Sequence, residues 1–219
     1  FLPGSQPFLH VNANGERYGA EMPFEPMLTN ARMNTPGNVA WSIFDSDYET
    51  YIMQQQPERY DRFTDGLDAV MEKWLGNGKL IKADTLDDLA KQLDIPADTF
   101  KATVERYNSM AEAGEDVDFD VPAQWLAPVK TAPFYATKNV CSTLTIPFGL
   151  HVNADSQVLT AEDEPIPGLF AIGNVQGDFF GKDYPVHCPG VSHGRCVTFG
   201  QLVGEACAKD TTIGELDFA

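Results

Sequence analysis

The segment from residue 165 to residue 208 constrains the fold more than any other. An unbroken apolar run, Leu169–Ile172, is followed by Gly173-Asn174, by a loop rich in glycine and proline that reaches Gly190, and by a helical pattern over residues 191–208. A short, unbroken apolar run fits a buried strand. A strand that passes through a glycine loop into a helix is a building unit of α/β proteins. We therefore expect an α/β chain.

The start of this helix is the first candidate site. A helix N-terminus offers unpaired N–H groups and a partial positive charge, which suit an anionic or electron-rich edge of a ligand. Gly173 and Gly177 would let such a ligand approach the backbone. Gly194, Gly200 and Gly204 lie within the helix, where glycine costs roughly 1 kcal/mol relative to alanine. They indicate close packing against a strand or a flat ligand, although helix–sheet packing would explain two of them. A cofactor or substrate site near residues 173–194 and a plain strand–loop–helix are the two interpretations.

Composition excludes several classes of protein. The 219 residues carry 15 Lys+Arg against 32 Asp+Glu, a formal charge of −17, and nucleic-acid binding needs clustered basic residues. No apolar run approaches the ~18 residues that span a bilayer, so we expect no membrane span. The chain begins at Phe1 without a signal-peptide pattern, which indicates processing or a piece cut from a longer protein. The four cysteines are expected as reduced thiols.

The remaining elements follow from hydrophobic periodicity and turn residues. Asn14-Gly15 predicts a hairpin with a type I′ turn over residues 9–18, and its His10, like His151 on a second hairpin, is expected at the surface or in packing. The other expected elements, in chain order, are a strand at 39–44, a helix over 63–74 stopped by Gly76-Asn77-Gly78, a strand at 80–81, a helix capped by Thr85 and Asp88, a helix opened by Pro96 and ended by Gly114, and the hairpin at 150–159.

Two patterns suggest a metal, and neither is complete. Asp116, Asp118 and Asp120 alternate as in the first half of a calcium loop, but Val121 and Ala127 occupy the positions of its glycine and glutamate, so a solvated acidic loop is expected. A second pattern is a group of histidines and cysteines close together in the sequence, namely His187, Cys188, His193 and Cys196. The group lacks any CxxC pair, so we expect no metal there.

Four ordered motifs resemble one family. Ile166–Asn174 and Thr198–Glu205 resemble "IPGLYAAGE" or "AGN" and "TFGRIAGE", the C-terminal FAD-binding signature of the fumarate reductase and succinate dehydrogenase flavoprotein superfamily, which includes ketosteroid dehydrogenases and urocanate reductases. The other matches are Val11–Tyr18 with Glu21 to "VNxxGxRFxNE", Ala102–Asn108 with Gly114–Asp116 and Phe119 to "TVxRYN…GxDxxF", and Pro133–Ala136 to "PFYA".

The resemblance covers nearly the whole chain and implies a C-terminal piece of such a flavoprotein. The Gly-x-Gly-x-x-Gly opening that seats the ADP half of FAD is absent from these residues, so the N-terminal dinucleotide-binding unit is missing. The implied organisation is the end of an FAD-binding segment at 1–21, an α+β substrate capping domain at 22–140, and the C-terminal part of a Rossmann-like FAD-binding domain at 141–219. The implied cofactor is FAD, and an upstream FAD-binding segment of the same protein is the implied partner.

The resemblance also implies a reaction, in which hydride passes between the flavin and a carbon–carbon double bond while a side chain moves a proton. Glu25 stands where fumarate reductases keep their proton-donating arginine, and the dicarboxylate-binding histidine and loop arginine are replaced near Leu144-Thr145 and Lys182–Tyr184. A small, non-dicarboxylate substrate is therefore expected. The alternatives are a fumarate reductase with displaced residues such as Arg32, and a flavin-free binding module that kept the fold.

Site residues follow from the same resemblance. Tyr184 and Gly190 match the ends of the "YPGPG" loop with which ketosteroid dehydrogenases polarise a substrate carbonyl, although two extra residues intervene here, and Tyr184-Pro185 could instead form a rigid turn. Expected to face the flavin are Gly173, Asn174, Val191, Ser192 and His193. The electron donor is not indicated, and both a cytoplasmic location and export to the bacterial cell envelope stay open.

Overall fold

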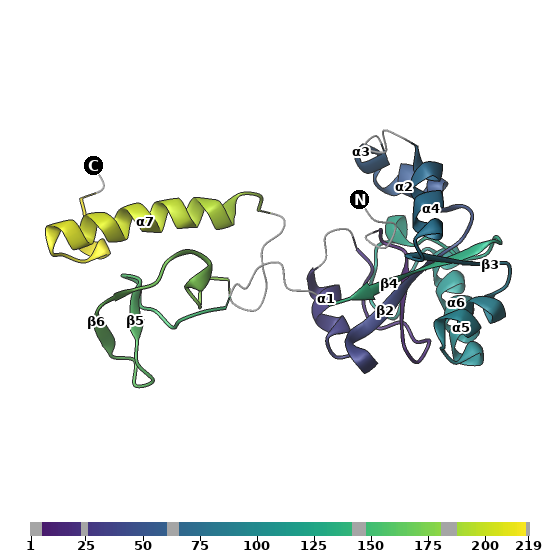
Figure 1. Ribbon diagram of the computed structural model, residues 1–219, viewed down its shortest axis with the longest axis horizontal. Coiled ribbons are helices and arrows are strands. Elements are labelled where there is room, and N and C mark those ends of the chain that lie inside the picture. The colour runs from purple at the N-terminus through teal and green to yellow at the C-terminus, as the bar shows by residue number, and fades with distance from the viewer. Residues whose placement is uncertain (1–5, 23–25, 61–65, 142–147, 181–187, 218–219) are drawn as a thin grey trace. The chain divides into compact units, whose positions relative to one another are not determined.

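The chain divides into two compact units, residues 1–141 and residues 142–219. The computed structural model describes residues 6–22, 26–60, 66–141, 148–180 and 188–217. Helices and strands are mixed throughout (Figure 1), which confirms the predicted α/β class. The units are treated separately below. The finer assignment of 1–21, 22–140 and 141–219 to FAD-binding and capping domains stays a prediction.

The first unit is built on a four-stranded sheet. Its strands are β1 (Leu9–Asn12), β2 (Val39–Phe44), β3 (Leu80–Ala83) and β4 (Phe134–Val140), in the order β1-β2-β4-β3. Every neighbouring pair is antiparallel, and Ile43 of β2 lies opposite Leu9 on one side and Ala136 on the other. The strand predicted at 39–44 is confirmed, and so is the one predicted at 80–81, which extends to Ala83.

Six helices surround this sheet in the described part of the unit. They are α1 (Pro26–Arg32), α2 (Tyr48–Gln55), α3 (Pro57–Tyr60), α4 (Leu67–Gly76), α5 (Leu86–Leu93) and α6 (Ala97–Ala113), with 3₁₀ turns at Pro36–Asn38 and Ala123–Trp125. Local signals set the ends of α5 and α6 as predicted. The Thr85 side chain accepts from the Asp88 N–H at 3.0 Å, and Gly114, with a φ of 69°, ends α6.

The sheet buries apolar side chains in two clusters. One joins β1 and β2 to α5 and α6 through residues such as Leu89, Phe100 and Tyr107, and all three are almost fully buried. The other gathers Phe8 and Phe44, whose rings stack with centroids 4.8 Å apart. Each such side chain contributes about 1.5–3 kcal/mol on burial, so the sheet and its helices form a stable frame for the polar groups described below.

The hairpin predicted at 9–18 is confirmed, but its turn is of another type. Val11 bridges Arg17 across it. Gly15 has a φ of 77°, whereas Asn14 is not among the residues of positive φ, and a type I′ turn needs both. The reason lies in Asn12, whose side-chain oxygen accepts from the N–H groups of Asn14 and Glu16 at 2.9 and 3.1 Å. This side chain closes the loop in place of a two-residue turn.

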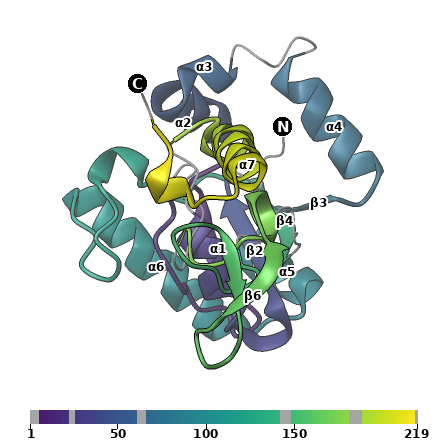
Figure 2. The ribbon, with the colours of Figure 1, turned by 90° about the vertical axis from the view of Figure 1, so that its left-hand side faces the viewer.

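The second unit contains one helix, a small sheet and short 3₁₀ turns in its described part. They are β5 (Gln157–Leu159), β6 (Pro165–Phe170), a 3₁₀ turn at Gly173–Val175, α7 (Val191–Lys209) and a 3₁₀ turn at Ile213–Glu215. The second predicted hairpin is confirmed by a Val152–Val158 bridge, and the helix predicted at 191–208 is confirmed. In both views α7 lies to one side of the β5–β6 pair (Figures 1 and 2).

The buried strand predicted at Leu169–Ile172 is wrong in two respects. The strand ends at Phe170, and it is mostly exposed, with Leu169 at 43% exposure. Within the described residues β6 pairs only with the three-residue β5, and of the predicted run only Ala171, just past the end of β6, is buried, at 3% exposure. No helix among the described residues is long and apolar enough to cross a membrane.

Candidate functional site

Residues predicted as a site in the second unit meet at the start of α7. Asn174 lies in the 3₁₀ turn that follows β6. Its side-chain oxygen accepts from Ser192 Oγ at 3.0 Å and from Arg195 Nη2 at 3.3 Å. Gly190, with a φ of 84°, is the N-cap residue that begins the helix. His193 is exposed in the first turn of the helix. The structure thus joins Asn174 to the helix start, as the sequence predicted, while the role of these residues stays a prediction.

Gly173 and Gly177 do not provide the open backbone that we expected for a ligand. A Cβ on Gly173, whose φ is 70°, would meet Cys196 Sγ at 2.8 Å. One on Gly177 would meet the carbonyl oxygen of Gly149 at 2.9 Å. The protein's own atoms therefore take the space that each missing side chain leaves, and the two glycines serve internal packing.

The glycines inside α7 differ from one another. A Cβ on Gly200 would contact Ile172 at 3.4 Å, as helix–strand packing requires. Nothing in the structure lies within 4 Å of a Cβ on Gly194 or Gly204. Because a helical glycine costs about 1 kcal/mol, these two positions are not explained by packing within the described structure. Gly194 lies beside the candidate site.

The N-terminal end of α7 carries uncompensated positive charge. The helix has 19 residues, no acidic side chain in its first turn and no side-chain cap. The N–H groups of Ser192 and His193 precede the first full turn and have no acceptor within the helix. The helix dipole adds roughly half a positive charge at this end. An electron-rich group is therefore attracted here.

Arg195 is the functional residue that sequence reasoning missed. Its side chain is only 4% exposed, and its guanidinium carbon lies 4.7 Å and 4.4 Å from the ring centroids of Phe179 and Phe180. Nε and Nη1 are buried and have no hydrogen-bond partner in the described structure. Each buried donor left unpaired costs about 1–3 kcal/mol. A signal existed in the sequence, because a cation near a helix N-terminus is on the wrong end of the dipole.

A second polar arrangement lies in the first unit, around the predicted residue Arg32. Arg32 is 8% exposed, and its Nε donates to the Tyr18 hydroxyl at 3.2 Å. The hydroxyl lies 3.3 Å from His10 Nδ1, and His10 Nε2 lies 2.6 Å from Ser42 Oγ, which also accepts from Asn139 at 2.9 Å. Burial, and secondarily the charge of Arg32, lower the pKa of His10 to about 3. Burial also raises the pKa of Tyr18. His10 is thus a packing residue, one of the two outcomes expected for it.

The loop predicted to be acidic and solvated is exposed at Asp118 and Asp120 as expected, but Asp116 belongs to a buried ion triad. Arg17 Nη2 lies 2.6 Å from Glu21 Oε2 and 2.7 Å from Asp116 Oδ2, and all three side chains are at most 5% exposed. The guanidinium also lies 5.1 Å and 4.9 Å from the ring centroids of Tyr107 and Phe119. Burial alone would raise the pKa of Asp116, but hydrogen bonds and charge from Arg17 override it and bring the pKa to about 2. The triad fixes the hairpin to the loop after α6.

Other predicted positions lie outside the described residues or away from any site. Glu25, Leu144-Thr145 and Lys182–Tyr184, including the predicted catalytic Tyr184, fall outside the described residues. Among described residues, no group of three or more His, Cys, Asp or Glu could hold a metal. The four cysteines are free thiols.

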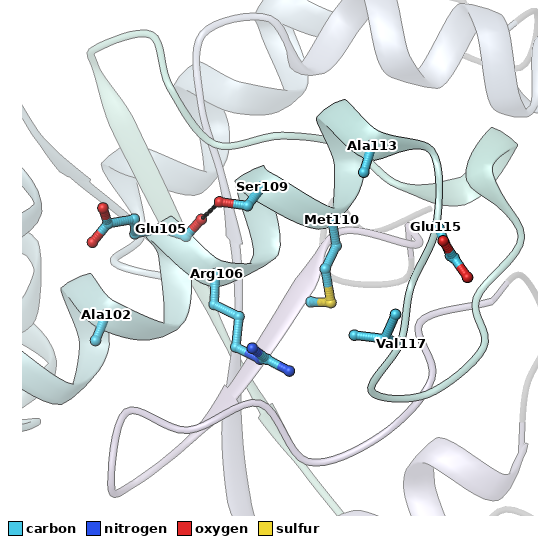
Figure 3. A pocket seen from close by; sticks show the side chains of 8 residues that line it. All are labelled: Ala102, Glu105, Arg106, Ser109, Met110, Ala113, Glu115 and Val117. Atoms are coloured by element: carbon cyan, nitrogen blue, oxygen red, sulfur yellow. Dashed lines mark hydrogen bonds between the residues drawn. The ribbon is translucent and has the colours of Figure 1, made fainter.

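Hollows in the surface of the first unit lie along α6, away from the predicted site residues. Figure 3 shows one of about 420 Å³, into which Arg106 and Met110 extend from the helix, with Val117 across from them. None of the residues predicted to bind substrate or cofactor lines it. Its other lining residues are Ala102, Glu105, Ser109, Ala113 and Glu115. It therefore does not coincide with the candidate site.

Comparison with known proteins gives the class. A family model described as "FAD binding domain" matches residues 6–185. The chain is 34% identical to a 3-oxosteroid 1-dehydrogenase of Mycolicibacterium smegmatis, over 91% of this chain and 37% of that protein. It is 29% identical to a urocanate reductase of Eggerthella lenta, over 90% of this chain and 30% of that protein.

Solved structures agree. A 3-ketosteroid Δ1-dehydrogenase from Sterolibacterium denitrificans, in complex with 1,4-androstadiene-3,17-dione, matches with a TM-score of 0.73 at 28% identity, over 96% of this chain and 40% of that one. The chain belongs to the FAD-binding fumarate reductase/succinate dehydrogenase flavoprotein family. It spans less than two fifths of the length of these curated relatives.

The residues at the start of α7 fit the family's cofactor, FAD, by their chemistry. The isoalloxazine ring of FAD is planar and carries carbonyl oxygens and ring nitrogens along one edge. The helix start offers first-turn N–H groups. Within the described part of the chain, Arg195 adds two buried donors without acceptors, and no atom lies within 4 Å of a Cβ placed on Gly194. Donors without acceptors and an uncovered glycine are what an acceptor-rich, flat group requires.

Proposed function

We propose that this chain is the capping and closing part of an FAD-dependent oxidoreductase. The complete protein would move hydride between FAD and an activated carbon–carbon double bond of a small organic substrate that is not a dicarboxylate. The observation that carries the proposal is the cluster of Asn174, Ser192 and Arg195 at the start of α7, in which Nε and Nη1 of Arg195 have no acceptor among the described residues. FAD supplies the hydride chemistry when it is bound, and the protein supplies position and charge.

The part played by this chain's residues follows from their chemistry. Donors at the helix start would hold and orient the electron-rich edge of the flavin, and the phenylalanine pair at Phe179 and Phe180 would exclude water from Arg195. Tyr184 and Gly190, by their resemblance to ketosteroid dehydrogenases, would polarise a substrate carbonyl. A polarised carbonyl next to the double bond makes that bond accept hydride more readily, which is the activation that the proposal requires.

The choice against a dicarboxylate is supported by charge. Glu25 occupies the position of the proton-donating arginine of fumarate reductases. Its carboxylate would repel a dianionic substrate. The alternative donor, Arg32, already donates to the Tyr18 hydroxyl through Nε at 3.2 Å. A fumarate reductase with displaced residues is therefore the second candidate, and Arg32 is the observation in its favour.

The second unit also supports an upstream segment as partner. Its small sheet has two strands, and isolated pairs of strands are marginally stable in water. Large apolar side chains of the second unit are exposed, among them Leu169 at 43%, Val175 at 55% and Val197 at 72%. Together with the short span relative to its relatives, this favours a further FAD-binding segment of the same protein that covers these side chains.

The test uses the complete protein, with whatever sequence flanks this chain in its gene. Purified protein should carry the two visible absorbance bands of oxidised flavin, and a reductant should bleach them. Anaerobic addition of candidate substrates should restore the bands for a conjugated steroid enone such as 1,4-androstadiene-3,17-dione, whose double bond accepts the hydride, and leave them bleached for fumarate. Restoration by fumarate, lost in Arg32→Gln, would favour the second candidate. A colourless protein that takes up no FAD would leave only the flavin-free binding module. If FAD is bound, the same bleaching assay can identify the electron donor.

A further inference from the structure

The guanidinium of Arg195 is a buried cation with too few acceptors. One of its nitrogens, Nη2, reaches Asn174, while Nε and Nη1 have no partner in the described structure although the side chain is 96% buried (4% exposed). Native proteins pair nearly all buried polar groups. A buried charged group that contacts two aromatic rings and lacks acceptors among the described residues therefore calls for a ligand that supplies them.

The surroundings of Arg195 decide the chemistry of that ligand. The first turn of α7 has no acidic side chain, and its dipole adds to the positive charge of the guanidinium. Asn174 already receives two donors, from Ser192 and Arg195. The site thus presents only donors and positive charge on its ligand side. The site therefore fits the edge of a ligand that carries two adjacent hydrogen-bond acceptors and gains negative charge when the ligand is reduced.

We propose that Arg195 binds the pyrimidine edge of the flavin and raises the reduction potential of the cofactor. This inference rests on the proposed function, since it requires FAD at the start of α7. The two-electron-reduced flavin carries more negative charge on that edge than the oxidised flavin. A fixed cation beside it in a water-poor setting stabilises the reduced form more than the oxidised form. Arg195 is thus a positioning and tuning residue for the cofactor.

The apoprotein provides a readout that a structural arginine would not give. Without cofactor, the unpaired donors of Arg195 are a cost, so replacing the side chain by methionine should leave the fold as stable or make it more stable. A structural arginine predicts the opposite, because its removal would uncover Phe179 and Phe180. The thermal midpoint of apoprotein therefore separates the two roles before any redox measurement.

The experiment compares the complete protein with three variants. Arg195→Met removes the charge, Arg195→Lys keeps it, and Lys209→Met removes an exposed charge from the far end of the same helix, where Lys209 pairs with Glu205 at 2.6 Å. FAD affinity is measured by titration of apoprotein, and the midpoint potential is measured by dye equilibration in the absence of substrate.

We expect Arg195→Met to weaken reduced FAD about tenfold more than oxidised FAD, which lowers the two-electron potential by about 30 mV. Arg195→Lys should stay near the parent value, and Lys209→Met should equal it. A second outcome also supports the inference: Arg195→Met loses FAD while the thermal midpoint of its apoprotein is unchanged, and Arg195→Lys retains FAD.

Several results would overturn it. They are an unchanged potential and FAD affinity in Arg195→Met, an effect confined to substrate KM, loss of FAD in the lysine variant too, or an apoprotein of Arg195→Met that melts well below the parent. A parent protein that binds no FAD defeats the proposed function itself. FAD bound by a parent whose potential ignores Arg195 defeats this inference alone.

Discussion

Acidification should destabilise the first unit through His10, and the size of the effect can be worked out. The His10 ring is fully buried, and its pKa is lowered to about 3 from the ordinary 6.5 by burial and by Arg32. Between these values the unfolded chain binds a proton that the folded chain does not, so stability falls as the pH falls below 6.5. At pH 4.5, two units below the unfolded pKa, the loss reaches about 3 kcal/mol. The stability that neutral His10 contributes is fully present only above pH 6.5.

Hydrogen bonds explain why the folded state resists this proton. Arg32 Nε donates to the Tyr18 hydroxyl, which leaves the hydroxyl hydrogen for His10 Nδ1. His10 Nε2 then carries the hydrogen of the neutral ring and donates it to Ser42 Oγ, a tautomer inferred from its partners. A proton on Nδ1 would face a hydroxyl that already receives one donor. Protonation therefore breaks the arrangement as well as placing a second charge near Arg32.

Urea unfolding of the 219-residue chain followed by tryptophan fluorescence measures the effect. All three tryptophans, Trp41, Trp74 and Trp125, belong to the first unit, so the signal reports the unit that holds His10. His10→Gln should be less stable than the parent at pH 7.5 through lost hydrogen bonds, by about 1–3 kcal/mol. By pH 4.5 this gap should shrink by about 3 kcal/mol, and close or reverse.

The control is His151→Gln, in the second unit. His151 is exposed, and hydrogen bonds to Asp178 and Asp163 raise its pKa. Its contribution is present at low pH and fades as the pH rises, so its sign is opposite and its effect on the tryptophan transition should be absent. A gap between parent and His10→Gln that stays constant from pH 7.5 to 4.5 would refute the argument.

Two further pairs of substitutions, each a test with its control, address the ion triad and Gly194. Asp116→Asn should lower the free energy of unfolding in urea by about 3–5 kcal/mol because it leaves Arg17 buried and underpaired. The control, Asp118→Asn, breaks an exposed pair in the same loop and should lower it by at most about 1 kcal/mol. Equal losses of stability in the two variants would contradict the burial of the triad. Gly194→Ala should stabilise α7 by up to about 1 kcal/mol yet weaken FAD binding in the complete protein. Gly200→Ala, whose Cβ would contact Ile172 at 3.4 Å, is the control in the same helix. Tight FAD binding by Gly194→Ala would show that nothing approaches this glycine.

Local signals in the sequence predicted α4, α5 and α6 of the first unit, whereas α1, α2 and α3 were not predicted. Thr85 and Asp88 start α5, and Pro96 and Gly114 bound α6, because each acts on backbone groups within a few residues. The turn at Asn14-Gly15 was predicted as a hairpin for the same reason. Its type was missed because a side chain outside the two turn residues closes the loop, and propensity rules for the two residues do not include it.

Features that depend on distant partners could not be predicted. Asp116 looked solvated because Arg17, 99 residues earlier in the chain, is the residue that buries and pairs it. The run at Leu169–Ile172 looked buried because its composition is that of a central strand, yet burial of β6 depends on layers that the described second unit does not supply. Asn174 and Ser192 were predicted from resemblance, and their hydrogen bond gives that prediction a physical basis without assigning the role.

Two of the buried arginines, Arg17 in the first unit and Arg195 in the second, show where a ligand is needed. Arg17 has both carboxylates it requires, Glu21 and Asp116, and so it contributes to the fold without any outside group. Arg195 is as deeply buried but, among the described residues, lacks acceptors for two of its nitrogens, and it lies at the end of α7 where the dipole opposes a cation. Proteins keep such unfavourable local arrangements mainly at functional sites. The imbalance at Arg195 is therefore a stronger indication of a cofactor than Gly173 and Gly177, since packing explains these two glycines and does not explain the arginine.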